Sequence, residues 1–257
     1  MIPKKIHYCW LGGAKKPELA EKCIASWEKI CPDYEIIEWN ESNLDISSFP
    51  LYTRQAYEAK KWGFVPDYIR CWLVYTYGGI YLDTDVEVIK NFDDLLDKPA
   101  FLGFEGANVN LGSGFGAEAG NPLLLAIMKD YEERPFIKPD GSLDLTPSPA
   151  LNSEVLKQHG MALNNKYQEI PGVAAIYPAE YFCPIDYYTG ELKATENTYS
   201  IHHYMASWMS KKQRKADIKK GKIWKNGDLK KDYADVKAER GVFYASLWYL
   251  KQKLKGR

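Results

Sequence analysis

The stretch Gly78-Gly79-Ile80-Tyr81-Leu82-Asp83-Thr84-Asp85-Val86 joins a glycine turn, a short apolar strand and two carboxylates one residue apart. Two carboxylates so close together repel each other unless a cation lies beside them. Hard divalent ions such as Mg²⁺ and Mn²⁺ prefer oxygen ligands of this kind. Such ions, when held by one or two carboxylates, complete their shell with water and phosphate oxygens. The stretch therefore predicts a site for Mn²⁺ or Mg²⁺ in an enzyme that uses a diphosphate-bearing compound.

A second polar group lies in the segment before this strand. Pro66 suits the first turn of a helix, and Gly78 suits its end, so we expect a helix over residues 66–77. Asp67 and Arg70 are three residues apart and would share one face of that helix. Taken alone, this pair is also compatible with a local ion pair near a helix N-terminus. Its place directly before the acidic strand favours a shared site.

Strand-like and helix-like segments alternate along the first half of the chain. This order predicts an α/β fold with a mainly parallel sheet and helices on both faces. Ligands of such sheets bind beyond the carboxyl ends of the strands, where Asp83 and Asp85 lie. The proline-rich residues 134–150 are expected to form a loop, and residues 177–184 to be irregular. We expect strands at residues 5–11, 34–39, 80–82, 101–105, 112–117 and 198–204, and helices at residues 18–30, 66–77, 121–131 and 233–255.

Composition narrows the class of protein. The 257 residues are 46% hydrophobic, enough to build a core, and the 34 basic residues balance the 34 acidic ones. A general nucleic-acid binder would carry a net basic footprint, so we expect no nucleic-acid partner. The five scattered cysteines are expected to be free thiols in a reducing compartment. We expect no signal peptide and no membrane-spanning segment, and hence a cytoplasmic protein.

Three blocks of sequence together resemble glycosyltransferase family 32, which carries an Asp-x-Asp signature. The family includes bacterial capsular-polysaccharide transferases and yeast initiating mannosyltransferases, and it is related to the catalytic domains of clostridial glucosylating toxins. The blocks occur in the family's order and together cover roughly residues 1–210. They are Ile2-Pro3-Lys4-Lys5-Ile6-His7-Tyr8-Cys9-Trp10-Leu11-Gly12, then Asp67-x-x-Arg70 with Gly78 to Asp85, and Ile201-His202-His203-Tyr204-Met205-Ala206-Ser207-Trp208.

The resemblance implies a fold and a reaction. The fold would be of the GT-A type, with a Rossmann-like, mainly parallel central sheet flanked by helices. The enzyme would move a hexose, with retention of configuration, from a UDP- or GDP-linked sugar to a saccharide or lipid-linked saccharide. The resemblance also implies Mn²⁺ or Mg²⁺ as the cofactor and a role in polysaccharide or capsule synthesis.

Site roles follow from the same resemblance, position by position. It implies catalytic roles for Arg70, Asp83 and Asp85, with Asp85 binding the ion directly and Asp83 contacting either the ion through water or the nucleotide sugar. His202 and His203 alternate along the late strand, and we favour His202 as the third metal ligand. Contacts to the donor are implied for a larger set: Cys9, Trp10, Leu11, Asp67, Arg70, Asp83, Asn110, Ser113, His203, Ser207 and Trp208.

The C-terminal part of the chain has two interpretations. Residues 211–231 are rich in lysine, and residues 233–255 have the pattern of an amphipathic helix. The segment 211–257 either binds an anionic membrane surface near a lipid-linked acceptor or packs as a solvated helix on the catalytic domain, residues 1–210.

Two other functions compete with the transferase. A phosphatase of the haloacid-dehalogenase type also uses Asp-x-Asp, but it needs the pair on the first strand and Thr or Val where this chain has Glu87. A non-catalytic sugar-binding module could hold a structural cation with the same two aspartates. Hydrolysis of a nucleotide sugar in the presence of Mn²⁺ would distinguish the transferase from such a module.

Overall fold

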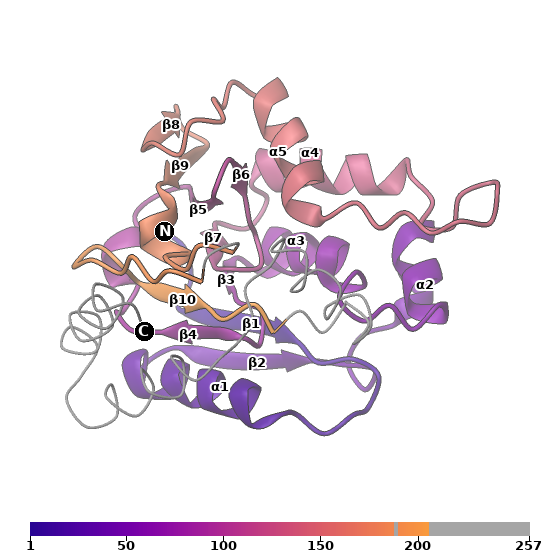
Figure 1. The fold of residues 1–257 in the computed structure, drawn as a ribbon, viewed down its shortest axis with the longest axis horizontal. Helices are drawn as coiled ribbons and strands as arrows, with labels where there is room; N and C mark the ends of the chain where they lie inside the picture. The colour runs from indigo at the N-terminus through magenta and orange to yellow at the C-terminus, as the bar shows by residue number, and fades with distance from the viewer. Residues whose placement is uncertain (188–189, 206–257) are drawn as a thin grey trace.

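The computed structural model describes residues 1–187 and 190–205 (Figure 1). The predicted site residues Ser207 and Trp208 and the segment 211–257 lie outside the described residues. In chain order the elements are β1 (Lys5–Cys9), α1 (Glu18–Ile30), β2 (Glu35–Trp39), η1 (Ile46–Ser48), α2 (Leu51–Glu58), α3 (Pro66–Tyr77), β3 (Gly79–Tyr81), β4 (Val86–Val88), η2 (Asp93–Leu95), β5 (Ala100–Glu105), β6 (Asn108–Val109), β7 (Phe115–Ala117), α4 (Pro122–Glu132), α5 (Ser148–Gln158), β8 (Gln168–Ile170), β9 (Ala174–Tyr177), α6 (Ala179–Phe182) and β10 (Ser200–His202).

The main sheet has the strand order β2-β1-β3-β7-β5-β9-β8, with β6 paired to β5. Strand β1 is parallel to both β2 and β3, and β5 is parallel to β9. Strand β7 is antiparallel to both of its neighbours, β3 and β5, so these two run in the same direction. Five strands of this path therefore share one direction, and the predicted α/β fold with a mainly parallel sheet is confirmed. A separate antiparallel pair is formed by β4 and β10.

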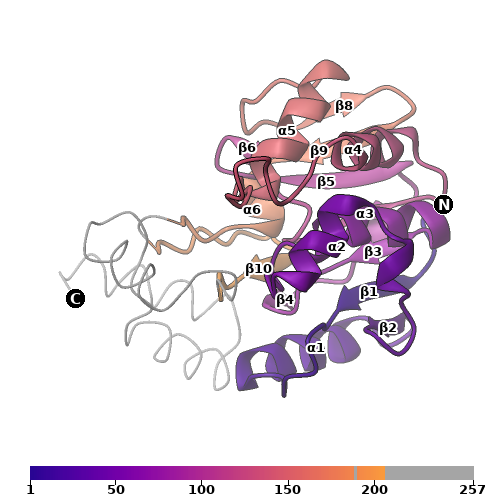
Figure 2. The same ribbon diagram turned by 90° about the vertical axis from the view of Figure 1, so that its right-hand side faces the viewer.

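Helices cover both faces of the main sheet. Helix α1 lies below β2 in Figure 1, whereas α3 and α4 lie on the other side of the strands, a separation that Figure 2 also shows. Successive side chains of a strand point to opposite faces. Ile80 and Leu82 accordingly pack in the core on the α1 side with Trp27, whereas Tyr81 packs in the core on the α3 side. The sheet is thus buried on both faces, and ligands can approach it only at its edges.

The end of α3 positions the acidic strand. Pro66 occupies the first turn of the helix, and Gly78 ends it with a φ of 64°, a left-handed conformation that glycine adopts without strain. The buried His7 Nε2 lies 2.9 Å from the Gly78 carbonyl oxygen, which ties this turn to β1. The chain can then enter the sheet beside β1, with His7 opposite Tyr81.

Several sequence-based boundaries differ from the structure. The first strand ends at Cys9, two residues earlier than expected. The predicted loop 134–150 contains the start of α5 at Ser148, and the segment 177–184, predicted to be irregular, contains α6. Both helices follow a proline, which is compatible with a loop but also with a helix start. Helix α2 and strands β8 and β9 were not predicted.

All five cysteines are free, as predicted, and all five are buried. Within residues 1–187 and 190–205, no helix is both long enough and apolar enough to cross a bilayer.

Candidate active site

The two aspartates of the signature lie in the turn between β3 and β4. Strand β3 ends at Tyr81, and β4 begins at Val86, whose N–H donates to the Asp83 carbonyl oxygen over 3.0 Å. This turn lies beyond the carboxyl end of β3, where the fold predicts a ligand site. Asp83 and Asp85 each present a carboxylate oxygen to His202, and the three ligand atoms lie within 4.8 Å of one another.

His202 reaches the aspartates because β10 pairs with β4, with His202 opposite Val86. Its Nε2 lies 3.4 Å from Asp85 Oδ1, while the Met205 N–H donates to Asp85 Oδ2 over 2.7 Å. The ring of His203 points elsewhere, with its Nε2 3.0 Å from Glu87 Oε2. The structure therefore brings His202, rather than its neighbour, to the acidic pair.

Arg70 lies between two acidic side chains. Its Nη2 is 3.0 Å from Asp67 Oδ1 and 3.5 Å from Asp83 Oδ1, and its Nε donates to the Pro66 carbonyl oxygen. The guanidinium carbon is 5.4 Å from the centre of the Tyr81 ring. Arg70 and Asp67 are each only 3% exposed. The predicted helix pair and the predicted acidic strand thus form one connected charge network.

Burial and charge set the protonation of this network. Burial raises the pKa of Asp67 to about 6, although the charge of Arg70 opposes the shift. Burial also raises the pKa of Asp83, again against the effect of Arg70. Burial acts to raise the pKa of Asp85 as well, but the charge and hydrogen bond of His202, the Met205 N–H and the charge of His203 together outweigh it, and the pKa falls to about 2. Asp85 is thus the more firmly anionic member of the signature.

The donor set fits the divalent ion that the resemblance implies. Two carboxylates and one imidazole converge from a turn and a neighbouring strand, all on side chains that are mostly buried. Carboxylate oxygens suit Mg²⁺ and Mn²⁺, and the imidazole favours Mn²⁺ of these two. Asp83, Asp85 and His202 are therefore the residues that would hold the ion.

A tight loop, residues 110–113, contacts Asp83. The Asp83 N–H donates to the Gly112 carbonyl oxygen over 2.9 Å, and the Gly112 N–H donates to Asn110 Oδ1 over 2.7 Å. The Ser113 hydroxyl donates to the Asn110 carbonyl oxygen over 3.0 Å. Asn110 and Ser113 are both buried, so in this structure their polar groups hold the loop in place. Contact of either residue with a donor sugar stays a prediction.

Gly112→Ala is expected to weaken Mn²⁺ binding about 10-fold or more, in the range seen when a group that orients a metal ligand is changed. A Cβ atom at this position would lie 2.1 Å from Asp83 Oδ2 and 2.8 Å from Arg70 Nη1, so the carboxylate must move. Electron paramagnetic resonance of free Mn²⁺ measures the binding. Gly116→Ala is the control, since the atoms nearest to its Cβ would belong to Phe101 and Ile80, and it should lower thermal stability without weakening Mn²⁺ binding. Equal Mn²⁺ affinity in Gly112→Ala and the parent would contradict the assignment of Asp83.

The end of β1 lies at the same edge of the sheet. Because β1 and β3 are parallel, the residues that follow His7 run beside those that follow Tyr81. Cys9 and Leu11 are buried, and burial raises the pKa of the Cys9 thiol to about 12. Trp10 is partly exposed, and its indole N–H donates to the Ala14 carbonyl oxygen over 2.6 Å. Of these three predicted donor contacts, Trp10 is the one with exposed ring surface.

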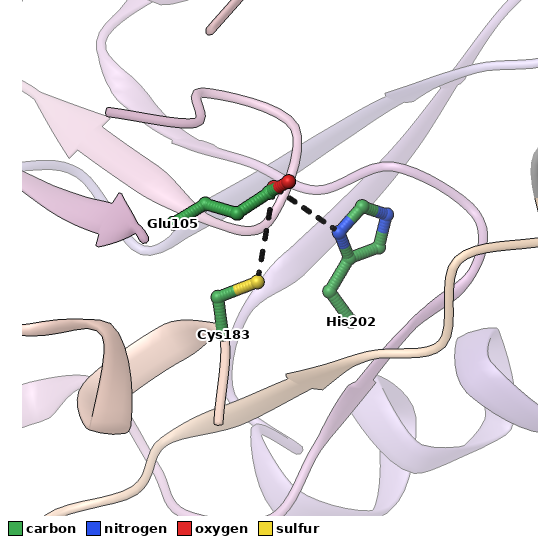
Figure 3. A group of neighbouring side chains, drawn as sticks. All are labelled: Glu105, Cys183 and His202. Carbon is green, nitrogen blue, oxygen red and sulfur yellow. Dashed lines mark hydrogen bonds and ion pairs between the residues drawn. The ribbon is translucent and has the colours of Figure 1, made fainter. Parts of the chain in front are cut away.

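Glu105 and Cys183 lie beside the site and were not predicted from the sequence. Glu105 is the last residue of β5, and Cys183 follows α6 directly. Both side chains point toward His202 (Figure 3). Strand β5 runs in the same direction as β3, so the rule that places ligands at carboxyl ends could have found Glu105. No sequence signal marks Cys183, which arrives there through the tertiary fold alone.

Part of the chain is similar in sequence to known glycosyltransferases. Residues 17–102 match the family described as glycosyltransferase sugar-binding region containing DXD motif. Inositol phosphoceramide mannosyltransferase 3 of Schizosaccharomyces pombe is 31% identical over 143 residues, which are 52% of this chain and 38% of that protein. Mannosyl phosphorylinositol ceramide synthase CSH1 of Saccharomyces cerevisiae is 28% identical over 196 residues, 70% of this chain and 49% of that protein. The chain spans less than half of the length of these relatives.

Two solved glycosyltransferases have a low likeness to this chain. PaToxG Glycosyltransferase is 18% identical, with a TM-score of 0.48 over 62% of this chain and 70% of its own. A glycosyltransferase involved in the glycosylation of the major capsid of PBCV-1 is 13% identical, with a TM-score of 0.43 over 83% of this chain and 98% of its own. The predicted resemblance to the DXD glycosyltransferases is confirmed by the family match over residues 17–102, which contain Asp67, Arg70, Asp83 and Asp85.

Proposed function

We propose that this protein is a metal-dependent retaining glycosyltransferase. It would move a hexose from a nucleotide-diphosphate sugar to a saccharide or lipid-linked saccharide, using Mn²⁺ or Mg²⁺. One observation carries the proposal: Asp83, Asp85, His202 and Arg70 converge at the carboxyl edge of the sheet, within and beside the matched DXD region. Residues 1–210 would form the catalytic domain.

The curated relatives suggest which sugar to test first. Two of them are named as mannosyltransferases of inositol phosphoceramide, and one as a mannosyl phosphorylinositol ceramide synthase. We therefore propose a mannosyl group as the first candidate and a lipid-linked acceptor as the first acceptor class. GDP- and UDP-linked donors are both to be assayed.

In the proposed reaction, the site must stabilise the departing nucleoside diphosphate. The bond between the sugar C1 and the phosphate oxygen breaks, and its electron pair goes to the departing nucleoside diphosphate while the acceptor hydroxyl bonds to C1. A divalent ion bound by Asp83, Asp85 and His202 would supply positive charge for that diphosphate. Arg70 holds Asp83 by an ion pair, which fixes the carboxylate in the buried network. Buried, preoriented charges of this kind are stronger than the same charges in water.

Other parts of the site would bind the rest of the donor. The partly exposed Trp10 offers a ring face for stacking on the nucleoside base, beside Cys9 and Leu11. Asp67 would act on the donor indirectly, by holding the guanidinium of Arg70, because its carboxylate is buried against that group. Contacts from His203, Asn110, Ser113, Ser207 and Trp208 are part of the same proposal.

A cytoplasmic location, a role in polysaccharide or capsule synthesis, and contact of residues 211–257 with an anionic membrane surface are also proposals. The ten lysines and arginines between residues 211 and 231 support the membrane contact. Flotation of the full chain with anionic liposomes tests it. Replacing Lys219, Lys220 and Lys222 with glutamate should release the protein, and unchanged flotation would contradict the contact.

Nucleotide-sugar hydrolysis is the direct test of the enzyme class. With Mn²⁺ and without an acceptor, a transferase should slowly release nucleoside diphosphate from its donor, because water replaces the acceptor. Removing the metal with EDTA should abolish the release, and added Mn²⁺ should restore it. A sugar-binding module would release none under either condition. GDP-mannose, UDP-glucose and a phosphomonoester are compared in parallel, and turnover of the phosphomonoester alone would favour the phosphatase.

A further inference from the structure

A second group of metal-binding side chains lies on the far side of His202. It consists of Glu105 at the end of β5, Cys183 after α6 and His202 at the end of β10, and their side chains point toward one another in Figure 3. Glu105 Oε2 lies 3.8 Å from Cys183 Sγ and 3.9 Å from His202 Nδ1. The proposed active site uses the other ring nitrogen of His202, so this group is not accounted for by that function.

The Cys183 thiol can donate a hydrogen bond to Glu105 Oε2 over 3.8 Å, but the spacing between His202 Nδ1 and Glu105 fits a shared ion better than a direct contact. A separation of 3.9 Å between nitrogen and oxygen is too long for a hydrogen bond. Ligands bound to Zn²⁺ at about 2.0–2.3 Å in a tetrahedron stand roughly 3.3–3.7 Å apart, close to the observed spacing. His202 Nδ1 is also buried without a hydrogen-bond partner among the described residues. A buried, unsatisfied ring nitrogen is costly, and a cation between these groups would satisfy it.

Neighbouring polar groups hold the three ligands. The Asn110 side-chain amide donates to Glu105 Oε2, the oxygen that faces Cys183 and His202. The Tyr204 hydroxyl lies 2.9 Å from Cys183 Sγ and donates to the Ile185 carbonyl oxygen. Hydrogen bonds that orient metal ligands from behind are a regular feature of built metal sites.

We propose that Glu105, Cys183 and His202 form a second metal site, selective for a thiophilic divalent ion of the Zn²⁺ class. A thiolate, an imidazole and a carboxylate are ligands that Zn²⁺ accepts, whereas Mg²⁺ and Mn²⁺ disfavour sulfur. Three protein ligands leave a fourth position for water. Binding replaces the proton of the Cys183 thiol with the ion, and the proton is released to solvent.

The two sites are coupled because they share one imidazole. When Nδ1 binds the thiophilic ion, the neutral ring keeps its proton on Nε2, which lies 3.4 Å from Asp85 Oδ1 and can donate to it. When Nε2 instead faces an ion at Asp83 and Asp85, the proton sits on Nδ1 and points toward Glu105. A neutral imidazole cannot serve both ions at once. Each ion therefore lowers the affinity of the other site by the same factor.

A titration of the reduced, full-length protein with Co²⁺ tests the second site directly. Tetrahedral Co²⁺ bound to thiolate gives an intense charge-transfer absorption, so the readout does not depend on activity. We expect the band in the parent protein and in Cys31→Ser, a control in which another buried thiol is lost. Cys183→Ser should lose the band, and Glu105→Gln should weaken Co²⁺ binding about 10-fold. Far-ultraviolet circular dichroism and melting temperature confirm that each variant is folded.

Competition by Mn²⁺ tests the coupling and separates it from the proposed function. Excess Mn²⁺ should weaken Co²⁺ binding about 10-fold in the parent, because Mn²⁺ at Asp83 and Asp85 changes how the His202 imidazole can bind Co²⁺. In Asp83→Asn the band should remain and Mn²⁺ should no longer affect it. A band that survives Cys183→Ser, or a folded parent without a band, would overturn the second site. Persistent Mn²⁺ competition in Asp83→Asn would overturn the coupling, whether or not the protein transfers sugar.

Discussion

Asp85→Asn is expected to reduce metal-dependent sugar transfer by about 10²–10³-fold, the range for loss of one preorganised charge-stabilising group. The asparagine keeps the shape of the side chain, and its oxygen can still accept the Met205 N–H that Asp85 Oδ2 accepts over 2.7 Å. It lacks the negative charge that a divalent ion requires. Turnover at saturating Mn²⁺, together with Mn²⁺ affinity from electron paramagnetic resonance, measures the effect.

Glu87→Gln is the matched control for Asp85→Asn. Glu87 lies two residues further along the chain, in β4, and its carboxylate faces His203 instead of His202. Removing that charge should leave Mn²⁺ affinity within about 3-fold of the parent, since Glu87 is not part of the metal site. Parent-like turnover in Asp85→Asn, or equal losses of Mn²⁺ affinity in the two variants, would contradict direct metal binding by Asp85.

Local signals made the acidic strand predictable from the sequence. Pro66 fixes the start of α3 and Gly78 its end, so the helix is found at residues 66–77 as expected. The strand that follows differs from its predicted bounds by one residue at each end. These features depend on the backbone preferences of two residues and on a short apolar run. The sheet directions of β1, β2 and β3 then follow from the order of the elements.

Pairing between strands far apart in the chain determines the parts of the site and sheet that the sequence did not predict. Sequence alternation shows that His202 and His203 face opposite ways, but only the register of β10 on β4 shows that His202 faces Asp85. Strand β7 lies in the centre of the sheet antiparallel to its neighbours, and no local sequence pattern predicts this direction. Cys183 reaches His202 for the same reason. Contacts between segments far apart in the chain are decided by the packing of whole elements.

Prolines caused the missed helices near the middle of the chain. Ser148-Pro149 opens α5 in a stretch that reads as a proline-rich loop, and Pro50 and Pro178 immediately precede α2 and α6. Proline is frequent both in loops and at the first positions of a helix. Helix α5 becomes stable through the burial of apolar residues such as Val155 and Leu156 against the rest of the fold. That burial is a tertiary effect, so the local sequence does not decide between a loop and a helix.

Arg70 contacts four groups at once through the planar shape of its guanidinium. Its Nη2 approaches Asp67 and Asp83, its Nε donates to the Pro66 carbonyl oxygen, and its face lies over Tyr81. Lysine carries the same charge on a single ammonium group and cannot reproduce that fork. The ionisation of Asp67 and Asp83 depends on the position of the Arg70 cation, because burial already opposes the charged form of both carboxylates.

Arg70→Lys is therefore expected to lower sugar transfer by about 10²-fold, because Asp83 loses its fixed partner beside the metal. The melting temperature should also fall, since breaking a buried pair costs about 3–5 kcal/mol and the retained charge offsets only part of that loss. Arg134→Lys is the control. That arginine contacts Asp130 and Asp144 near the end of α4, is more exposed, and should change activity and stability little. Steady-state turnover and thermal unfolding of both variants measure the difference, and parent-like turnover of Arg70→Lys would show that the guanidinium has no part in the reaction.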